Sequence, residues 1–128
     1  MKKLAVATGL AVVVAIFATT AGQSQSAGLP DALAAGWQGE PVCELQHQAA
    51  THRVLLCTFP PGVGHERHYH PAHFGYALSG GTMRLTSEAG IREAEVEAGS
   101  SFSSTGVDWH EAVNIGETTV AYLMIEEL

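Results

Sequence analysis

The sequence predicts an all-β fold, a small antiparallel β-barrel or sandwich formed by one domain. Three observations support this: short runs rich in β-branched and aromatic residues, turn-forming residues between them, and no long helical pattern. The length of 128 residues suits one domain. With no helices to cover a parallel sheet, many short strands favour antiparallel pairing. The expected strands are residues 53–59, 74–78, 83–87, 91–97 and 118–125.

The N-terminus differs in character from the rest of the chain. Two lysines precede an apolar run over residues 4–17, and small or polar residues follow. This is the layout of a secretory signal peptide, and the run is shorter than the about 20 residues that a membrane span needs. We expect residues 1–21 to be a signal peptide, cleaved after Ala21 or alternatively after Ala27, with an uncleaved anchor as a further alternative. In each case the domain is exported, to the periplasm or outside the cell.

The next segment, residues 22–39, is rich in Gly, Ala, Ser and Gln. Such a composition predicts a flexible tether, with one helical turn at residues 31–35. The barrel itself is then expected over residues 40–128.

Two cysteines lie in the first part of the expected barrel. If residues 42–47 and 52–59 form a hairpin centred on Ala50, Cys43 and Cys57 stand opposite each other. Opposed residues at a non-hydrogen-bonded position approach closely enough to be bridged, and an exported chain meets oxidising conditions. A disulfide and a pair of small core side chains are both compatible with this pattern.

The later strands alternate between apolar and polar residues. Met83 and Leu85 alternate with Arg84 and Thr86, and several acids crowd residues 91–97. Strands of this kind have one face in contact with water. Glycine-rich connectors separate them, as expected for turns.

The charge of the mature domain is strongly acidic. Lys2 and Lys3 lie in the leader, so only four arginines remain against 13 acids. A chain with so few basic residues lacks the groups that contact phosphates, so we expect no nucleic-acid partner and no membrane interaction beyond export. The simplest reading of the charge is solubility.

Histidines form the main functional signal. Four of them, His65, His68, His70 and His73, lie within nine residues, and His110 lies far along the chain. Imidazole is a common ligand of divalent transition metals, and two histidines separated by one residue in a strand face the same side. His68 and His70 can thus share a metal ion with His110. Histidines scattered over the surface are the alternative.

These residues fall in two motifs that resemble those of the cupins. Gly62 stands five residues before the His68-Tyr69-His70 segment, and residues 76–81 look like the strand and turn that close the first motif. Gly99, His110 and Asn114 match the second motif at the family spacing.

The resemblance covers roughly residues 53–125, and it implies several properties. The fold would be the double-stranded β-helix of the cupins, a jelly-roll-like barrel. The cofactor would be one divalent metal ion, such as iron, manganese, nickel or zinc. Small barrels of this family tend to pair through exposed sheets, so a homodimer is also expected.

The sequence departs from the family pattern in two places. The glutamate ligand of the first motif is missing, because its position falls on Phe74 or Gly75. Another alignment puts His73 there, so His73 is either a fourth ligand or a residue of the pocket wall. In the second motif Thr105 and Val107 replace the family's Pro and Gly, so we expect an altered turn before His110.

The resemblance leaves the activity open. A metal with three neutral ligands suits a dioxygenase, or an isomerase or lyase, acting on a small oxygenated organic molecule. The alternatives are a non-catalytic module of the cell envelope that binds a metal or small ligand, and a purely structural metal site. His73 and His65 are candidates for a general base, although we favour an exposed loop position for His65.

Overall fold

The computed structural model describes residues 28–128, and the expected signal peptide, residues 1–21 with its cleavage at 21 or 27, lies outside them. The described part is all-β, as predicted, and it contains no helix long and apolar enough to cross a membrane. Its strands are β1 (Gly36–Trp37), β2 (Glu40–Pro41), β3 (Cys43–Gln48), β4 (His52–Phe59), β5 (Gly64–His70), β6 (His73–Ser79), β7 (Gly81–Ser87), β8 (Gly90–Val96), β9 (Ser101–Ser104), β10 (Val107–Asn114) and β11 (Val120–Glu127).

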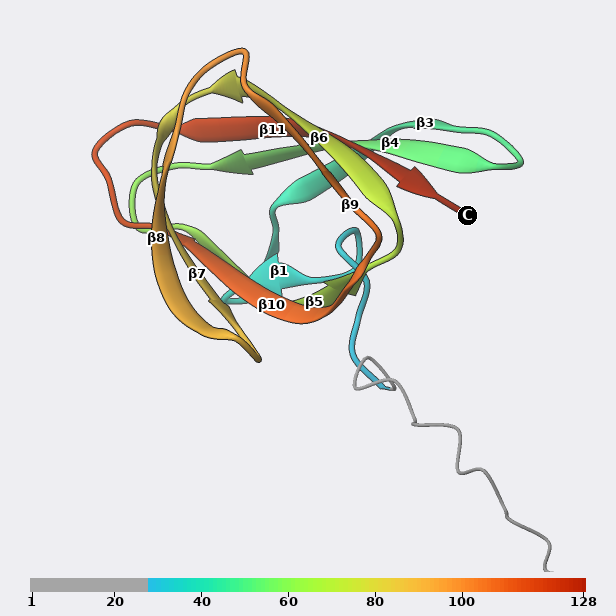
Figure 1. Cartoon of the computed structure of the whole chain (residues 1–128), viewed down its shortest axis with the longest axis horizontal. Coiled ribbons are helices and arrows are strands. Elements are labelled where there is room, and N and C mark those ends of the chain that lie inside the picture. Colours follow the sequence, from blue (N-terminus) through green and yellow to red (C-terminus); the bar gives the residue numbers. More distant parts are fainter. Residues whose placement is uncertain (1–27) are drawn as a thin grey trace, which may run out of the picture.

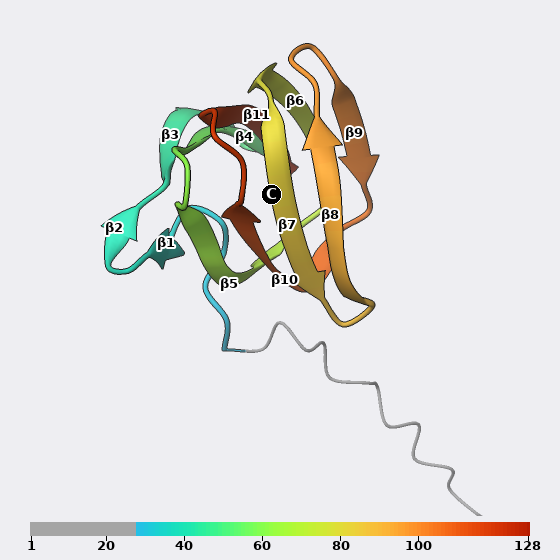
Figure 2. The same cartoon turned by 90° about the vertical axis from the view of Figure 1, so that its left-hand side faces the viewer.

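Two antiparallel sheets form the barrel. One has the strand order β5-β10-β7-β8 and the other β3-β4-β11-β6-β9, while β1 and β2 form a separate ribbon. In Figure 1 the strands close into a ring, with β4, β6 and β11 on one side and β5 and β10 on the other. Figure 2 shows β7 and β8 running side by side as a long hairpin. Each sheet thus presents one face to a shared interior.

The interior is filled by alternate residues of the strands. In β4 the buried positions include Leu55, Cys57 and Phe59, and β7 and β11 contribute Met83 and Met124. Because successive side chains of a strand point to opposite faces, this alternation fixes the register of the core.

Cys43 and Cys57 are joined by a disulfide. They are directly paired in the β3–β4 ladder, with their Cα atoms 4.0 Å apart. The structure therefore confirms the disulfide among the two alternatives that the sequence left open. Bridging a loop of this length stabilises a fold by about 3 kcal/mol.

The described part of the segment expected to be a tether is packed against the barrel. The predicted helical turn is present, because the Ala35 N–H donates to the Asp31 carbonyl at 2.9 Å. Asp31 also forms a β-bridge with Tyr69, and Ala32 is fully buried. Small residues such as Ala32 suit a flexible linker and a close backbone contact equally well, so composition alone did not reveal this packing.

Candidate metal centre

Two neighbouring strands bring the predicted ligands together. His68 and His70 lie on β5 with their side chains buried, and His110 on β10 is paired with His68 in the antiparallel ladder. The turn before β10 contains Gly106 with a positive φ of 122°, a conformation that glycine adopts readily. In the altered second motif, Gly106 therefore makes the turn although the family's Pro and Gly are replaced. His110 keeps its place despite that change.

The three histidines converge through their Nε2 atoms. These atoms are 2.9 Å apart for His68 and His70, 3.0 Å for His70 and His110, and 3.0 Å for His68 and His110. Adjacent nitrogen ligands on one ion, with metal–nitrogen bonds of about 2.1 Å, lie about 3 Å apart when they are at right angles. The spacing therefore fits a single divalent metal ion, and these three residues form the group positioned to hold one.

Hydrogen bonds on the other ring nitrogens set the tautomers. Nδ1 of His68 donates to the Glu66 carbonyl at 2.6 Å, and Nδ1 of His70 donates to Glu126 Oε1 at 2.6 Å. Since a neutral imidazole carries one proton, both Nε2 atoms then face each other with lone pairs. Lone pairs that converge at this distance repel unless a cation lies between them. The converging lone pairs are therefore the main observation that supports a metal ion at this position.

The surroundings keep the ligands neutral. Burial, and then the neighbouring His65, lower the pKa of His68 to about 2. Burial, and then His70, lower the pKa of His110 to about 3. Neutral imidazole is the form that binds metal ions, so the site favours binding over protonation.

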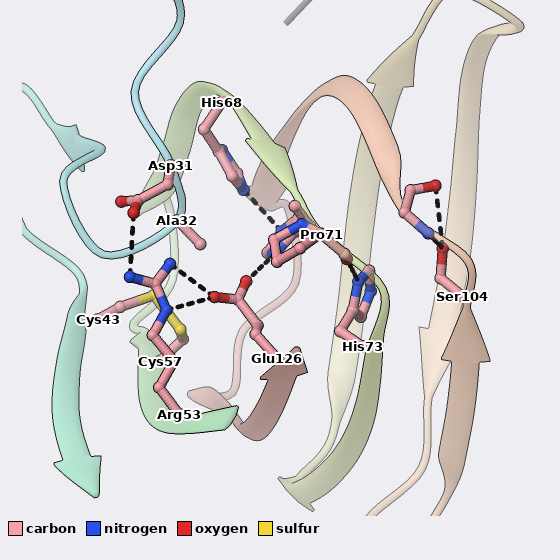
Figure 3. A network of polar contacts seen from close by, with 12 residues as sticks. Asp31, Ala32, Cys43, Arg53, Cys57, His68, Pro71, His73, Ser104 and Glu126 are labelled. Carbon is pink, nitrogen blue, oxygen red and sulfur yellow. Dashed lines mark hydrogen bonds and ion pairs between the residues drawn. A yellow bond between two sulfur atoms is a disulfide. The ribbon is translucent and has the colours of Figure 1, made fainter. Parts of the chain in front are cut away.

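A series of ion pairs and hydrogen bonds leads from His70 through Glu126 and Arg53 to Asp31 (Figure 3). Glu126 on β11 is fully buried and receives hydrogen bonds from His70 and from Arg53, whose Nη2 lies 2.6 Å from Glu126 Oε2. Arg53 in turn pairs with Asp31 at 3.0 Å. Burial alone would raise the pKa of Glu126, but the His70 and Arg53 hydrogen bonds outweigh it and lower that pKa. The carboxylate therefore stays ionised and orients His70.

Sequence reasoning missed Glu126, although a signal was present. Val120, Met124 and Glu126 occupy alternate positions of β11 and are all buried. An acid that continues the apolar alternation of a core strand points inward, where it needs a partner.

His73 lies beside the cluster and is not among the three converging residues. Its ring centre is 4.7 Å from that of His70, and its Nδ1 donates to the Pro71 carbonyl at 2.8 Å. Figure 3 shows this side chain on the far side of Glu126 from Arg53. Burial lowers the pKa of His73, which keeps the ring neutral.

His65 is buried, so the expectation of an exposed loop position was wrong. Its ring stacks on His68 with centroids 3.7 Å apart, and its Nε2 donates to the Ala32 carbonyl at 3.0 Å. A register shift in the β5–β10 ladder, between His110 and Ala112, turns His65 inward. Burial, and then His70, lower the pKa of His65 to about 4.

No carboxylate takes the place of the missing family glutamate in the described residues. Gly75 is buried there, and the ring of Phe102 occupies the space where a Cβ at Gly75 would lie. Asn114, the last residue of the second motif, is buried in a structural role, donating to the Phe59 and Thr118 carbonyls at 2.7 Å.

A cavity of about 540 Å³ adjoins the cluster. His70, His73 and His110 contribute to its wall, and apolar side chains form much of the remainder. The volume is within the range of about 300–1,000 Å³ that is typical of small-molecule sites. The apolar lining includes Phe59, Met83, Leu85, Phe102 and Met124.

The fold and the site together define the class of protein: a small antiparallel β-barrel with an interior cavity lined in part by histidines. The chain belongs to the cupin domain family Cupin_2, which matches residues 55–126. That range contains His68, His70 and His110 as well as Glu126.

Solved structures share this fold. A cupin domain from Bordetella pertussis Tohama I is similar with a TM-score of 0.64 and 20% identity, covering 78% of this chain and 96% of that one. A cupin superfamily protein from Desulfitobacterium hafniense DCB-2 gives a TM-score of 0.53 at 13% identity, covering 67% and 75%. A double-stranded β-helix protein from Klebsiella pneumoniae gives 0.53 at 16%, covering 70% and 78%. No curated protein sequence matches the chain.

Proposed function

We propose that the protein binds one divalent transition metal ion, such as iron, manganese, nickel or zinc, through His68, His70 and His110. The convergence of three Nε2 atoms, two of them with the proton held on Nδ1, carries this proposal. The adjoining cavity is the place where a small oxygenated organic molecule would reach the ion.

We further propose that the site is catalytic, as a dioxygenase or as an isomerase or lyase. The ion would supply Lewis acidity, or oxygen binding if it is iron. Among the residues of the chain, His73 is placed to accept a proton. Its Nδ1–H is held by Pro71, so in the neutral ring Nε2 has a free lone pair, and the residue lines the cavity.

One observation favours the alternative, a non-catalytic module that binds a metal or small ligand in the cell envelope. The acid that usually completes the first motif is absent, and the only carboxylate that touches the cluster in residues 28–128 is Glu126, which is engaged with Arg53 and His70. If the site is catalytic, no carboxylate is left to transfer a proton, and that role falls to His73. A His73→Gln variant that keeps ligand binding but loses turnover would favour the enzyme.

The experiment that tests the metal proposal is elemental analysis of untagged protein. Native protein should contain about one transition metal per chain, and His68→Ala and His110→Ala should lose it. His47→Ala is a matched control, because His47 is exposed on β3 and is not one of the converging residues. Native protein that stays metal-free after reconstitution with each of the four metals would refute the proposal.

We also propose that the domain works outside the cytoplasm, in the periplasm or secreted. The Cys43–Cys57 disulfide supports this, because such bonds form and persist in oxidising compartments. N-terminal sequencing of the protein from the cell envelope tests it, with a start at residue 22 or 28 expected. Recovery of an intact chain with reduced cysteines from the cytoplasm would contradict it.

A homodimer is our proposal for the quaternary structure. Phe74, Tyr76 and Leu78 on β6 and Ile125 on β11 are 39–47% exposed on the outer face of the five-stranded sheet. Ile125 is paired with Phe74, so the apolar residues are contiguous across two strands. Exposed apolar patches of this kind mark interaction surfaces, and a second copy of the chain offers a matching one.

A further inference from the structure

The four arginines of residues 28–128 differ in their partners. Arg53 is held by Glu126 and Asp31, Arg84 pairs with Glu93, and Arg67 stacks on Trp109 at 3.4 Å. The side chain of Arg92 makes no hydrogen bond or ion pair within this part of the chain, yet it lines the interior cavity. A cation without a partner at the wall of a cavity is a candidate for binding an anion.

The register of the β7–β8 hairpin explains why Arg92 faces the cavity. Arg92 is paired with Leu85, and Ala94 with Met83, and all four residues line the cavity. The intervening pair, Arg84 and Glu93, forms a salt bridge on the outer face with both side chains about half exposed. Since paired residues share a face, Arg92 belongs to the inner face.

The charge of Arg92 also acts on the cavity wall. It lowers the pKa of Tyr122 against the larger effect of burial. Arg92 is solvent-exposed, whereas His70 in the same cavity wall is buried, so the cavity is lined by an accessible cation as well as by the buried histidines. Glu95, the acid that also lines the cavity, accepts a hydrogen bond from Thr82 at 2.8 Å.

The rest of the cavity wall suits the body of an organic ligand. Phe102, Tyr122 and Leu85 contribute rings and an aliphatic side chain. The Tyr122 hydroxyl makes no hydrogen bond with the described residues, and burial raises its pKa to about 12, so it remains a hydrogen-bond donor.

We propose that Arg92 binds a carboxylate of the ligand, so that the protein acts on a small organic acid with an oxygen-bearing end at the histidine cluster and a carboxylate at the cavity mouth. This inference rests on the proposed metal site. A single guanidinium matches one carboxylate through two parallel N–H···O bonds, and the single charge of the carboxylate balances that of Arg92. The carbon chain between the two ends would lie against Phe102 and Tyr122.

The test uses the cobalt-substituted protein, whose visible spectrum reports an oxygen ligand at the ion. Three pairs of probes differ only in a distal carboxylate or methyl group: malate with 2-hydroxybutyrate, 2-hydroxyglutarate with 2-hydroxyvalerate, and 2-hydroxyadipate with 2-hydroxyhexanoate. At one chain length, the diacid should bind native protein at least about tenfold more tightly than its partner. Arg92→Gln should abolish that preference, Arg92→Lys should retain part of it, and Arg84→Gln, on the outer face of the same hairpin, should leave it unchanged.

The outcomes separate the two proposals. If both members of every pair bind native protein equally, or if the preference survives Arg92→Gln, the role of Arg92 is refuted while the metal site stands. If native protein takes up no cobalt, the metal site is refuted and the role of Arg92 with it. If cobalt binds but none of the six acids changes its spectrum, the metal site stands and the role of Arg92 is refuted.

Discussion

Glu126 on β11 and His70 on β5 are joined across the barrel by a hydrogen bond of 2.6 Å between Oε1 and Nδ1. The two strands belong to different sheets, so this bond connects the metal centre to the opposite wall. A carboxylate behind a ligating histidine fixes the ring orientation and makes the other nitrogen a stronger ligand. Arg53 completes the arrangement by compensating the buried negative charge.

Replacing Glu126 by Gln should weaken metal binding by about 10- to 100-fold, because Nδ1 of His70 loses its ionised acceptor. The measurement is a competition titration of apo protein with zinc and a chromophoric chelator. Glu127→Gln is the matched control, since Glu127 is the exposed neighbour on the same strand.

An equal affinity in native protein and Glu126→Gln would show that His70 is held in place without the carboxylate. Because the substitution also leaves Arg53 with a weaker partner, thermal unfolding of the variant is needed to show that the binding data come from folded protein.

Acid should destabilise the metal-free protein through His65. Burial lowers its pKa from 6.5 to about 4, so the unfolded chain takes up a proton between these values and the folded protein does not. His65 therefore does not lower the free energy of unfolding well above pH 6.5. It lowers that free energy increasingly as pH falls toward 4, by roughly 2 kcal/mol at pH 5. Urea unfolding in excess chelator at pH 7.5 and pH 5 measures the total loss, to which His68 and His110 also contribute because their pKa values are lowered as well.

His65→Phe should reduce this loss between the two pH values, because the phenyl ring can stack on His68 but cannot take up a proton. His47→Gln, at an exposed position, should leave it unchanged. A His65→Phe variant that loses as much stability as native protein would contradict the assignment.

Local patterns in the sequence predicted much of the fold. The expected strand at residues 83–87 became β7 (Gly81–Ser87), and the one at 118–125 became β11 (Val120–Glu127). Alternation in strands is a local property, and so is the spacing that placed Cys43 opposite Cys57. The shared orientation of His68 and His70 could be predicted in the same way, because residues separated by one position in a strand share a face, and the second motif indicated His110.

The residues around the histidines could not be placed in the same way. Arg53 and Glu126 are 73 positions apart in sequence, so their pairing depends on how β4 and β11 meet. His65 faces inward because of an irregularity in the β5–β10 ladder that no local pattern reveals. Ala32 is buried through the docking of the N-terminal segment on the barrel, and its residue type is common in linkers as well.

Removing the disulfide should destabilise the barrel. The Cys43→Ala, Cys57→Ala double variant is expected to lose about 2–4 kcal/mol of unfolding free energy, because the unfolded chain regains the freedom of the bridged loop. Urea unfolding of the oxidised native protein and the variant measures the difference. Two free thiols in unreduced, denatured native protein would contradict the bond itself.

The outer apolar face of the five-stranded sheet should determine the oligomeric state. Native protein is expected to have the mass of a dimer by light scattering, and a Phe74→Glu, Leu78→Glu variant should be monomeric, because four buried carboxylates per dimer would lack partners. Ile91→Glu is the matched control, since Ile91 is 71% exposed on β8 of the other sheet and should leave the mass unchanged. The metal content should stay the same in both variants, which separates loss of the dimer from loss of the fold. A native protein with the mass of a monomer at high concentration would refute the dimer.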